Sequence, residues 1–467
     1  MHFGDITSIH NRITIHPSQA GNQLRLYYSK ILQTSLWIVG SPWPMISDCV
    51  SMGAAYDSQE RDTAPWCHPG TRRGILKRIE KWVKARSGGT SVLWLHGPAG
   101  AGKSVITQTV AETCAGRHQL TGTFFFARTV AGRNSIRYLF LTIAVQIAFS
   151  APEKRQRLDK ILNGEPYIVE HAWGSLDLMA SLFQDCSKAN PSPLIVIIDG
   201  LDECQGHNDQ LRILAEVSCM VKTHHLPLRF VIVSRPESHL YDAFEEPSMA
   251  IITKSLSLYD DFWARVDVSS YLRSEFSRIH DSKRHKYVMQ LVPTPWPSED
   301  AIQKIVHNSW GYFIYVSTVI KFVDEENFLP TDRLCQVLNS SNSSNPPGDS
   351  APFAELDKLY LQIISLCQTS NLPILKVILG YIVVPHLNPL HRDIVIDLDD
   401  IESFLHLPRG QVKLMLRKLR SLVTFGESLG DVELLTLHHA SFENVSEPRR
   451  TRLNHAERVL NVEQTAM

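Results

Sequence analysis

Apolar residues change their spacing twice along this chain of 467 residues. Up to about residue 65 they stand singly among Gly, Ser, Pro and His, a pattern typical of an irregular arm (residues 1–65). Residues 66–265 alternate short apolar runs with amphipathic stretches, which predicts a parallel β-sheet flanked by helices. From about residue 268 the spacing becomes helical. The chain is therefore predicted to be α/β first and α-helical afterwards.

Five apolar runs are predicted to form the strands of the sheet. They are Val92–His96, Thr123–Ala127, Leu194–Ile198, Arg229–Val233 and Met249–Thr253. The uninterrupted Leu-Ile-Val-Ile-Ile sequence of the third run is typical of a strand buried on both faces. Helical spacing between the runs, as in Ile136–Ile147, predicts the helices that flank this five-stranded sheet.

A helix is also predicted directly before the first strand. Thr71 is a suitable N-cap for it, and apolar residues then recur at helical spacing. These residues are Ile75, Leu76, Ile79, Trp82 and Val83. The other face carries basic residues, namely Arg72, Arg73, Lys77, Arg78, Lys81 and Lys84. We interpret that face as solvated, with contact to phosphates or lipid headgroups as the alternative.

The second half of the chain divides at a stretch rich in Asn, Ser, Pro and Gly. A helical domain is predicted for residues 266–338 and a flexible linker for residues 339–352. Within residues 353–445, two short helices precede a hairpin at residues 423–438, which predicts a helical and winged-helix-like region. Residues 446–467 are predicted to be a C-terminal tail.

Composition and charge make several classes of protein less favourable without excluding a local binding site. Lys and Arg number 47 against 48 Asp and Glu, so the net charge of -1 gives no general attraction to nucleic acid or to an anionic membrane. The 8 cysteines are scattered without zinc-site spacing, which favours reduced thiols. Neither a signal peptide nor an apolar run long enough to span a membrane is present. We therefore expect a cytoplasmic protein.

A phosphate-binding loop is predicted between the first strand and the helix that follows it. The pattern GxxxxGK[ST] is met by Gly97, Pro98, Ala99, Gly100, Ala101, Gly102, Lys103 and Ser104. The glycines let backbone N–H groups approach phosphate oxygens, and the helix N-terminus adds positive potential. Lys103 is expected to neutralise the β- and γ-phosphates of ATP or GTP, and Ser104 to ligate Mg²⁺. A chance glycine-rich turn is the alternative.

Two further strands are followed by charged residues. After the third strand, Asp199 is expected to hold Mg²⁺ through water, and either Asp202 or Glu203 to orient or deprotonate the attacking water. Carboxylates that merely cap a strand are the alternative. After the fourth strand, Arg235 is in a position to sense the γ-phosphate, with a structural salt bridge as the alternative.

With these motifs in this order, the chain resembles the NACHT family of signal-transduction NTPases, and in particular its fungal members. The resemblance extends over roughly residues 54–445 and is more specific than a P-loop alone. Besides the P-loop, it rests on Cys67–Arg72, Phe124–Arg128, Asp199–Cys204, Ser234–Glu237, Gly311–Thr318, Pro352–Asp357 and Leu437–Phe442.

The resemblance implies a molecular switch. Its nucleotide would lie between the sheet domain and the winged-helix-like unit, closed with diphosphate and open with triphosphate. Lys103, Ser104, Asp199 and Arg235 would then bind nucleotide, and His439 would approach the β-phosphate in the closed form unless it is a buried structural histidine. The open form would self-associate or join NLR-like partners, in fungal non-self recognition or cell death.

The chain departs from the family pattern near its C-terminus. No array of sensor repeats follows the winged-helix-like unit, and Glu443-Asn-Val replaces the familiar Asp-Phe-Leu. Two hypotheses therefore remain beside a switch with slow hydrolysis. One is a non-catalytic scaffold stabilised by nucleotide, and the other is DNA binding through the basic residues of 411–422, which the net charge disfavours.

Overall fold

The computed structural model describes residues 46–340 apart from residues 63, 86–89, 151, 165–174, 184–193 and 260–262. Beyond residue 340 it describes short pieces between residues 356 and 378, residues 398–416, residue 419, and two strands at 423–426 and 434–437. Most of the predicted linker, the whole predicted tail and His439 lie outside the described residues.

Five parallel strands form the central sheet in the order β2-β3-β4-β1-β5. They are β1 (Val92–His96), β2 (Leu120–Phe125), β3 (Leu194–Asp199), β4 (Leu228–Ser234) and β5 (Thr253–Ser257). Every residue of β1 and β4 is buried, as expected for strands covered on both faces. The sheet confirms the predicted α/β class, and its carboxyl edge collects the three motifs that follow β1, β3 and β4.

The predicted bounds of the fifth strand are wrong. Pro247 begins a short helix, α10 (Pro247–Ala250), and β5 starts only at Thr253. This strand lies at the sheet edge beside β1, and Leu256 is its one buried residue. Because its sequence Thr-Lys-Ser-Leu-Ser contains no apolar run, the hydrophobic pattern could not locate it.

One face of the sheet is covered by α3 (Arg73–Lys84) and α4 (Lys103–Gly116). Helix α3 confirms the predicted apolar stripe, but Thr71 is not its N-cap, because the cap is Arg72 in the left-handed conformation. Arg72 is 4% exposed, so its assignment to a solvated face is also wrong. The other five basic residues of that face are exposed, as predicted.

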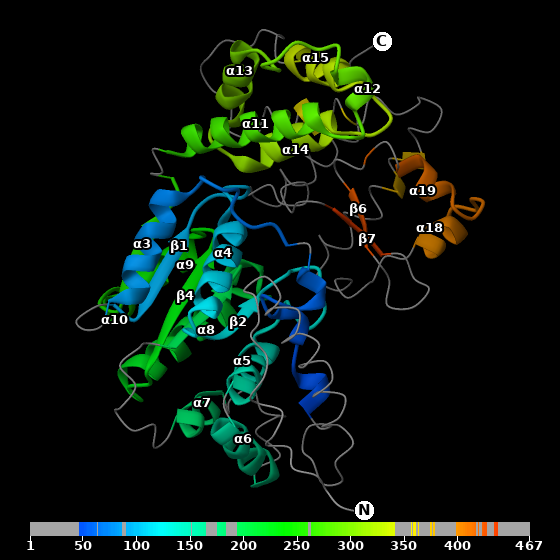
Figure 1. Ribbon diagram of the computed structural model, residues 1–467. Helices are drawn as coiled ribbons and strands as arrows, with labels where there is room; N and C mark the ends of the chain where they lie inside the picture. Colours follow the sequence, from blue (N-terminus) through cyan, green and yellow to red (C-terminus); the bar gives the residue numbers. More distant parts are fainter. Residues whose placement is uncertain are drawn as a thin grey trace, which may run out of the picture.

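The other face carries a larger apolar core around Trp94, Phe124 and Phe230. The helices that build it are α5 (Ile136–Ser150), α6 (Pro152–Gly164), α7 (Ser175–Phe183), α8 (His207–Lys222) and α9 (Ser238–Glu245). Most side chains of α5 are buried, so this helix is the central one of the layer. Figure 1 shows α6 and α7 farther from the sheet, beyond α5.

The segment before α3 is irregular but packs against the sheet domain. It contains three short 3-10 helices, η2 (Ser47–Cys49), η3 (Met52–Ala54) and η4 (Gln59–Arg61). Tyr56 donates its backbone N–H to Thr123 Oγ1 of β2 at 2.9 Å, and its carbonyl accepts from Gln108 of α4 at 3.0 Å. From residue 46 on, this segment therefore packs as part of the sheet domain.

A layer of helices lies above the sheet domain (Figure 1). It comprises α11 (Ala264–Asp281), α12 (Lys286–Met289), α13 (Glu299–Ser309), α14 (Phe313–Val323) and α15 (Pro330–Ser340). Figure 1 shows α11 and α14 running side by side over the ends of α3 and α4. This helical region follows the sheet as predicted.

Two short helices and a hairpin follow at the predicted positions. The helices are α18 (Leu398–Phe404) and α19 (Gln411–Leu416), and β6 (Val423–Gly426) pairs antiparallel with β7 (Leu434–Leu437). Buried Glu402 accepts backbone N–H groups of Gly410 at 2.7 Å and Val412 at 2.9 Å, which caps the start of α19. The buried side chains of α18 and α19 share one core with α11, α14 and α15.

Candidate nucleotide-binding site

The P-loop connects β1 to α4 at the carboxyl edge of the sheet. Gly100 and Gly102 have φ values of +71° and +84°, which glycine adopts without strain. Gly102 is the N-cap of α4, so the first backbone N–H groups of this helix face the loop. Lys103 donates from Nζ to the carbonyls of Gly97 at 3.0 Å and Pro98 at 2.9 Å. The loop therefore wraps around the Lys103 ammonium group, which is the group expected to bind phosphate.

Neighbouring elements approach this loop closely at two glycines. A Cβ atom on Gly97 would collide with Leu258, and one on Gly100 would collide with Ile314 at the start of α14. Ile314 also donates its backbone N–H to the Gly100 carbonyl at 3.3 Å. The phosphate loop is therefore in direct contact with the helical region.

A candidate Mg²⁺ position lies where α4 begins beside the end of β3. Ser104 donates from Oγ to Asp199 Oδ2 at 2.6 Å. Asp199 is 3% exposed, and its Oδ1 is buried without a hydrogen-bond partner among the described residues. Burial raises the pKa of Asp199, while the Ser104 hydrogen bond and the charge of Arg61 lower it. A nearby cation would stabilise the ionised form of this buried carboxylate. A hydroxyl and a carboxylate oxygen are ligands that suit Mg²⁺.

The remaining acidic residues have different partners. Asp202 is 3% exposed and accepts the Arg235 backbone N–H at 2.9 Å, while Arg235 Nε lies 3.2 Å from its other oxygen. Glu203 accepts the Arg128 backbone N–H at 3.2 Å. Burial and the charge of Asp202 raise the pKa of Glu203, opposed by Arg235. Asp202 is thus paired with Arg235, whereas Glu203 accepts a long backbone hydrogen bond from Arg128 and lies within the influence of the Arg128 and Arg235 charges.

Lys103 lies among these charged groups. Burial lowers the pKa of Lys103, whereas Asp202, Asp199 and Glu203 raise it and Arg235 lowers it further. The structure therefore brings the residues proposed from the sequence together at one edge of the sheet; they are Lys103, Ser104, Asp199, Asp202, Glu203 and Arg235. His439 is outside the described residues.

Two arginines lie near the site that sequence reasoning did not assign to it. Arg61 stacks over the Phe125 ring at 3.6 Å and donates to Gln108 at 3.0 Å. Burial lowers its pKa to about 10, although Asp199 attracts it. Arg61 belongs to the segment predicted to be an arm, where no pattern distinguishes it from a surface residue.

Arg72 is the second of these arginines. Its Nη2 donates to the Ala101 carbonyl at 2.7 Å, and its backbone N–H donates to Asp267 Oδ2 of α11 at 2.8 Å. Its guanidinium lies 4.9 Å from the centre of the Phe313 ring. Arg72 therefore contacts the P-loop and two helices of the helical region. The Pro69-Gly70 turn just before it was the available signal that the chain bends here.

A cavity of about 350 Å³ opens beside the P-loop. Its walls come from the P-loop, from the segment before α3, and from α11 and α14, and they are mostly apolar. Lining residues include Trp66, Cys67, Arg72, Gly100, Gly102, Val105, Tyr271, Phe313, Ile314 and Tyr360. Mostly apolar cavities with a few polar groups are typical of small-molecule sites. Because Gly100 and Gly102 belong to both the cavity wall and the phosphate loop, one ligand can reach both.

These features define a P-loop NTPase. Residues 70–235 match the family model described as Nephrocystin 3, N-terminal, which covers α3, the P-loop and the strands through Arg235. Over these residues, the match, the motifs and the order of the strands are those of a NACHT-class P-loop NTPase domain. Compared with curated proteins, the chain has no match.

Several solved structures are similar to the chain at low sequence identity. A STAND protein with a tetratricopeptide repeat sensor from Pyrococcus horikoshii is 11% identical, with a TM-score of 0.41 over 85% of this chain and 45% of that protein. The Aeropyrum pernix ORC1 protein in complex with DNA is 11% identical, with a TM-score of 0.37 over 90% and 96%. Cdc6p from Pyrobaculum aerophilum is 13% identical, with a TM-score of 0.35 over 84% and 95%. The chain thus spans less than half of the STAND protein.

Within the described ranges, each helix is too short or too polar to cross a bilayer.

Proposed function

We propose that this chain is a nucleotide-driven signalling switch that binds ATP or GTP with Mg²⁺ and hydrolyses it slowly. The observation that carries the proposal is the 2.6 Å contact between Ser104 and Asp199, with Asp199 Oδ1 buried and unpartnered among the described residues. A hydroxyl at a P-loop helix and a carboxylate at a strand end are the pair that holds Mg²⁺ beside nucleotide phosphates. Bound Mg²⁺ would neutralise charge on the β- and γ-phosphates.

The other charged residues of the site would bind phosphate, activate water and position Arg235. Lys103 would exchange its bonds to the Gly97 and Pro98 carbonyls for bonds to phosphate oxygens. Glu203 is the better candidate to orient or deprotonate water, because Asp202 is already paired with Arg235. A raised pKa brings a carboxyl closer to the range in which a general base works best. Asp202 would act as a positioning residue that aims Arg235 at the γ-phosphate.

The nucleoside would occupy the apolar cavity beside Gly100 and Gly102. Aromatic and aliphatic walls suit a purine ring, while the polar groups near the P-loop suit the sugar and phosphates. Because Phe313 and Ile314 form part of this wall, the nucleotide would join the sheet domain to the helical region. A change from triphosphate to diphosphate would then alter the contact between the sheet domain and the helical region. We expect the nucleotide to control self-association or NLR-like assembly through this contact.

The first test is to identify the nucleotide that co-purifies with the protein. The full chain is purified, denatured and its released nucleotide identified, and Lys103→Ala is treated in the same way. We expect diphosphate in the parent protein and little or none in the variant. A folded parent without nucleotide would favour a degenerate site. The base that is released also decides between adenine and guanine.

The second test separates a slow NTPase from a non-catalytic scaffold. Glu203→Gln is expected to retain triphosphate and to reduce turnover by at least about 100-fold, the usual contribution of a general base. Asp202→Asn is a second test and should reduce turnover by loosening Arg235, whereas Glu245→Gln, at an exposed carboxylate that ends α9, is the matched control and should turn over as the parent does. Tight nucleotide binding without turnover in the parent protein would support the scaffold.

A further inference from the structure

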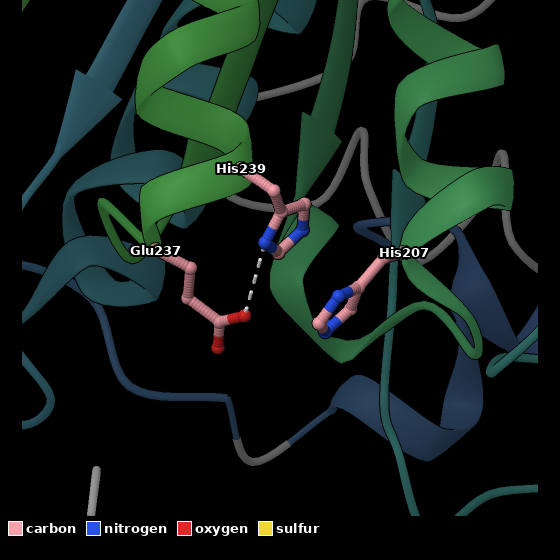
Figure 2. A group of neighbouring side chains, drawn as sticks. All are labelled: His207, Glu237 and His239. Carbon is pink, nitrogen blue, oxygen red and sulfur yellow. Dashed lines mark ion pairs between the residues drawn. The ribbon is translucent and has the colours of Figure 1, made fainter.

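Three potential metal ligands that are not part of the P-loop gather at the starts of two helices (Figure 2). His207 is the first residue of α8, Glu237 is the N-cap of α9, and His239 lies in the first turn of α9. One nitrogen or carboxylate oxygen from each lies within 4.8 Å of the others. Figure 2 shows the two imidazole rings and the carboxylate facing a common space between α8 and α9.

The hydrogen bonds of His239 fix which ring nitrogen is available. Gln210 donates from Nε2 to the carbonyls of Cys204 at 2.7 Å and Asp202 at 3.3 Å, so its Oε1 is the atom that faces His239. The contact between Gln210 Oε1 and His239 Nε2 is 2.6 Å, which requires the proton on Nε2. Nδ1 of a neutral His239 therefore carries a lone pair. An N–H held in this way by a carbonyl oxygen is the usual arrangement behind a metal-bound histidine.

That lone pair points at a carboxylate. His239 Nδ1 lies 3.9 Å from Glu237 Oε2. A water molecule, a proton on Nδ1 or a metal ion can bridge two acceptors at this distance, and the third ligand in reach, His207, favours the metal ion. Burial and the adjacent His207 lower the pKa of His239, which disfavours the proton at neutral pH. The carboxylate also offsets the positive potential from the two helix N-termini.

The distances suit a small transition-metal ion. Two ligands of one Zn²⁺ ion, each bound at about 2.1 Å, are roughly 3.4 Å apart in a tetrahedron and at most about 4.2 Å apart. The 3.9 Å gap already falls in this range. His207 stacks on His239 with ring centres 4.0 Å apart, and because it is exposed its ring can rotate to bring one nitrogen to the same ion.

We propose that His207, Glu237 and His239 bind one divalent transition-metal ion, with Zn²⁺ as the best fit and a fourth position open to water. Two imidazoles and a carboxylate suit Zn²⁺ better than Mg²⁺ or Ca²⁺, which prefer oxygen ligands. The site is separate from the P-loop position but is connected to it, because Gln210 also binds the Asp202 carbonyl and Glu237 lies two residues after Arg235. A bound ion would hold α8 and α9 together beside the acidic motif.

The test is a titration of the full chain with Co²⁺, a spectroscopic substitute for Zn²⁺, in excess Mg²⁺ to occupy sites built from oxygen ligands. The parent protein is expected to bind one Co²⁺ with the visible absorption of nitrogen and oxygen ligation, and Zn²⁺ should displace it. His207→Ala and Glu237→Gln should each weaken Co²⁺ binding at least tenfold. His224→Ala, which changes an exposed histidine just beyond the other end of α8, should leave binding unchanged.

Circular dichroism checks that each variant is folded. We expect this result because the three substituted side chains are exposed or partly exposed. The proposal is overturned if the parent protein binds no Co²⁺, or if His224→Ala weakens binding as much as His207→Ala does. Charge-transfer absorption typical of thiolate ligands would also overturn it, because the ion would then be bound by a cysteine. None of these readouts depends on nucleotide hydrolysis.

Discussion

At the candidate nucleotide site, the charge of Asp199 opposes the stability of the folded chain. Asp199 is a buried carboxylate with one oxygen unpartnered among the described residues, and burial raises its pKa. Asn has the same shape and can still accept from Ser104, but it carries no charge. A buried group without a full set of partners costs about 1–3 kcal/mol, so charge and stability oppose each other here.

We therefore predict that Asp199→Asn raises the melting temperature of the nucleotide-free protein while abolishing Mg²⁺-dependent nucleotide binding. The gain should correspond to about 1 kcal/mol or more. Because the folded pKa is raised, the cost of the ionised carboxylate is absent below about pH 4 and grows as the pH rises through the folded pKa. Thermal unfolding in EDTA at neutral and at acidic pH measures this. A variant less stable than the parent protein at neutral pH would contradict it.

Arg72 shows where residue-level reasoning fails. The P-loop and the acidic cluster could be proposed from the sequence because the phosphate and the metal ion that they are expected to bind would fix the spacing of their residues. Arg72 instead stood among six basic residues of one helix face, and nothing in its type distinguished it. Its burial depends on the left-handed backbone that turns it toward Ala101 and Phe313.

We predict that Arg72→Lys weakens nucleotide binding about tenfold or more, although the charge is preserved. Lys lacks the planar guanidinium that both donates to the Ala101 carbonyl and packs on Phe313. Lys77→Ala on the exposed side of α3 is the matched control and should bind as the parent does. Equal affinities for Arg72→Lys and the parent, measured with a fluorescent nucleotide, would refute this role.

Elements that pack on two faces were predictable, whereas an edge element was not. The apolar run of β3 is buried on both sides, so its pattern survives in the sequence, but β5 buries only Leu256. The contact between α14 and the P-loop was equally invisible. It depends on the missing side chain of Gly100, which leaves room for Ile314.

At this contact we predict that Gly100→Ala destabilises the protein in two separable ways. A non-glycine residue at a φ of +71° costs roughly 1–2 kcal/mol, and the new Cβ atom also collides with Ile314. Adding Ile314→Ala removes the collision but not the backbone strain. The double variant should therefore be more stable than the sum of the two single changes allows, as chemical denaturation would show. Strict additivity would mean that α14 does not press on the loop.

At the scale of the whole molecule, the cavity lies where segments distant in the sequence meet. Its walls combine the segment before α3, the P-loop and helices α11 and α14, which are far apart in sequence. Sequence reasoning placed a sheet domain and a helical domain in the right order. It could not show that they meet at Arg72, which binds Asp267, because that hydrogen bond depends on the folded arrangement of both.

If nucleotide fills this cavity, it should bind the two parts of the molecule together. We predict that adding Mg²⁺ and nucleotide slows hydrogen exchange of backbone amides in α14 and in residues 65–72 as well as in the P-loop, because a ligand that touches both walls stabilises both against local opening. The amides of α6, beyond α5 on the far layer, serve as the internal control and should not change. Protection confined to the P-loop would mean that the phosphates bind without seating the nucleoside against α14. The same experiment on Lys103→Ala should show no protection in any segment, since without the phosphate contact the apolar cavity alone holds nucleotide too weakly to join the sheet domain to the helices above it.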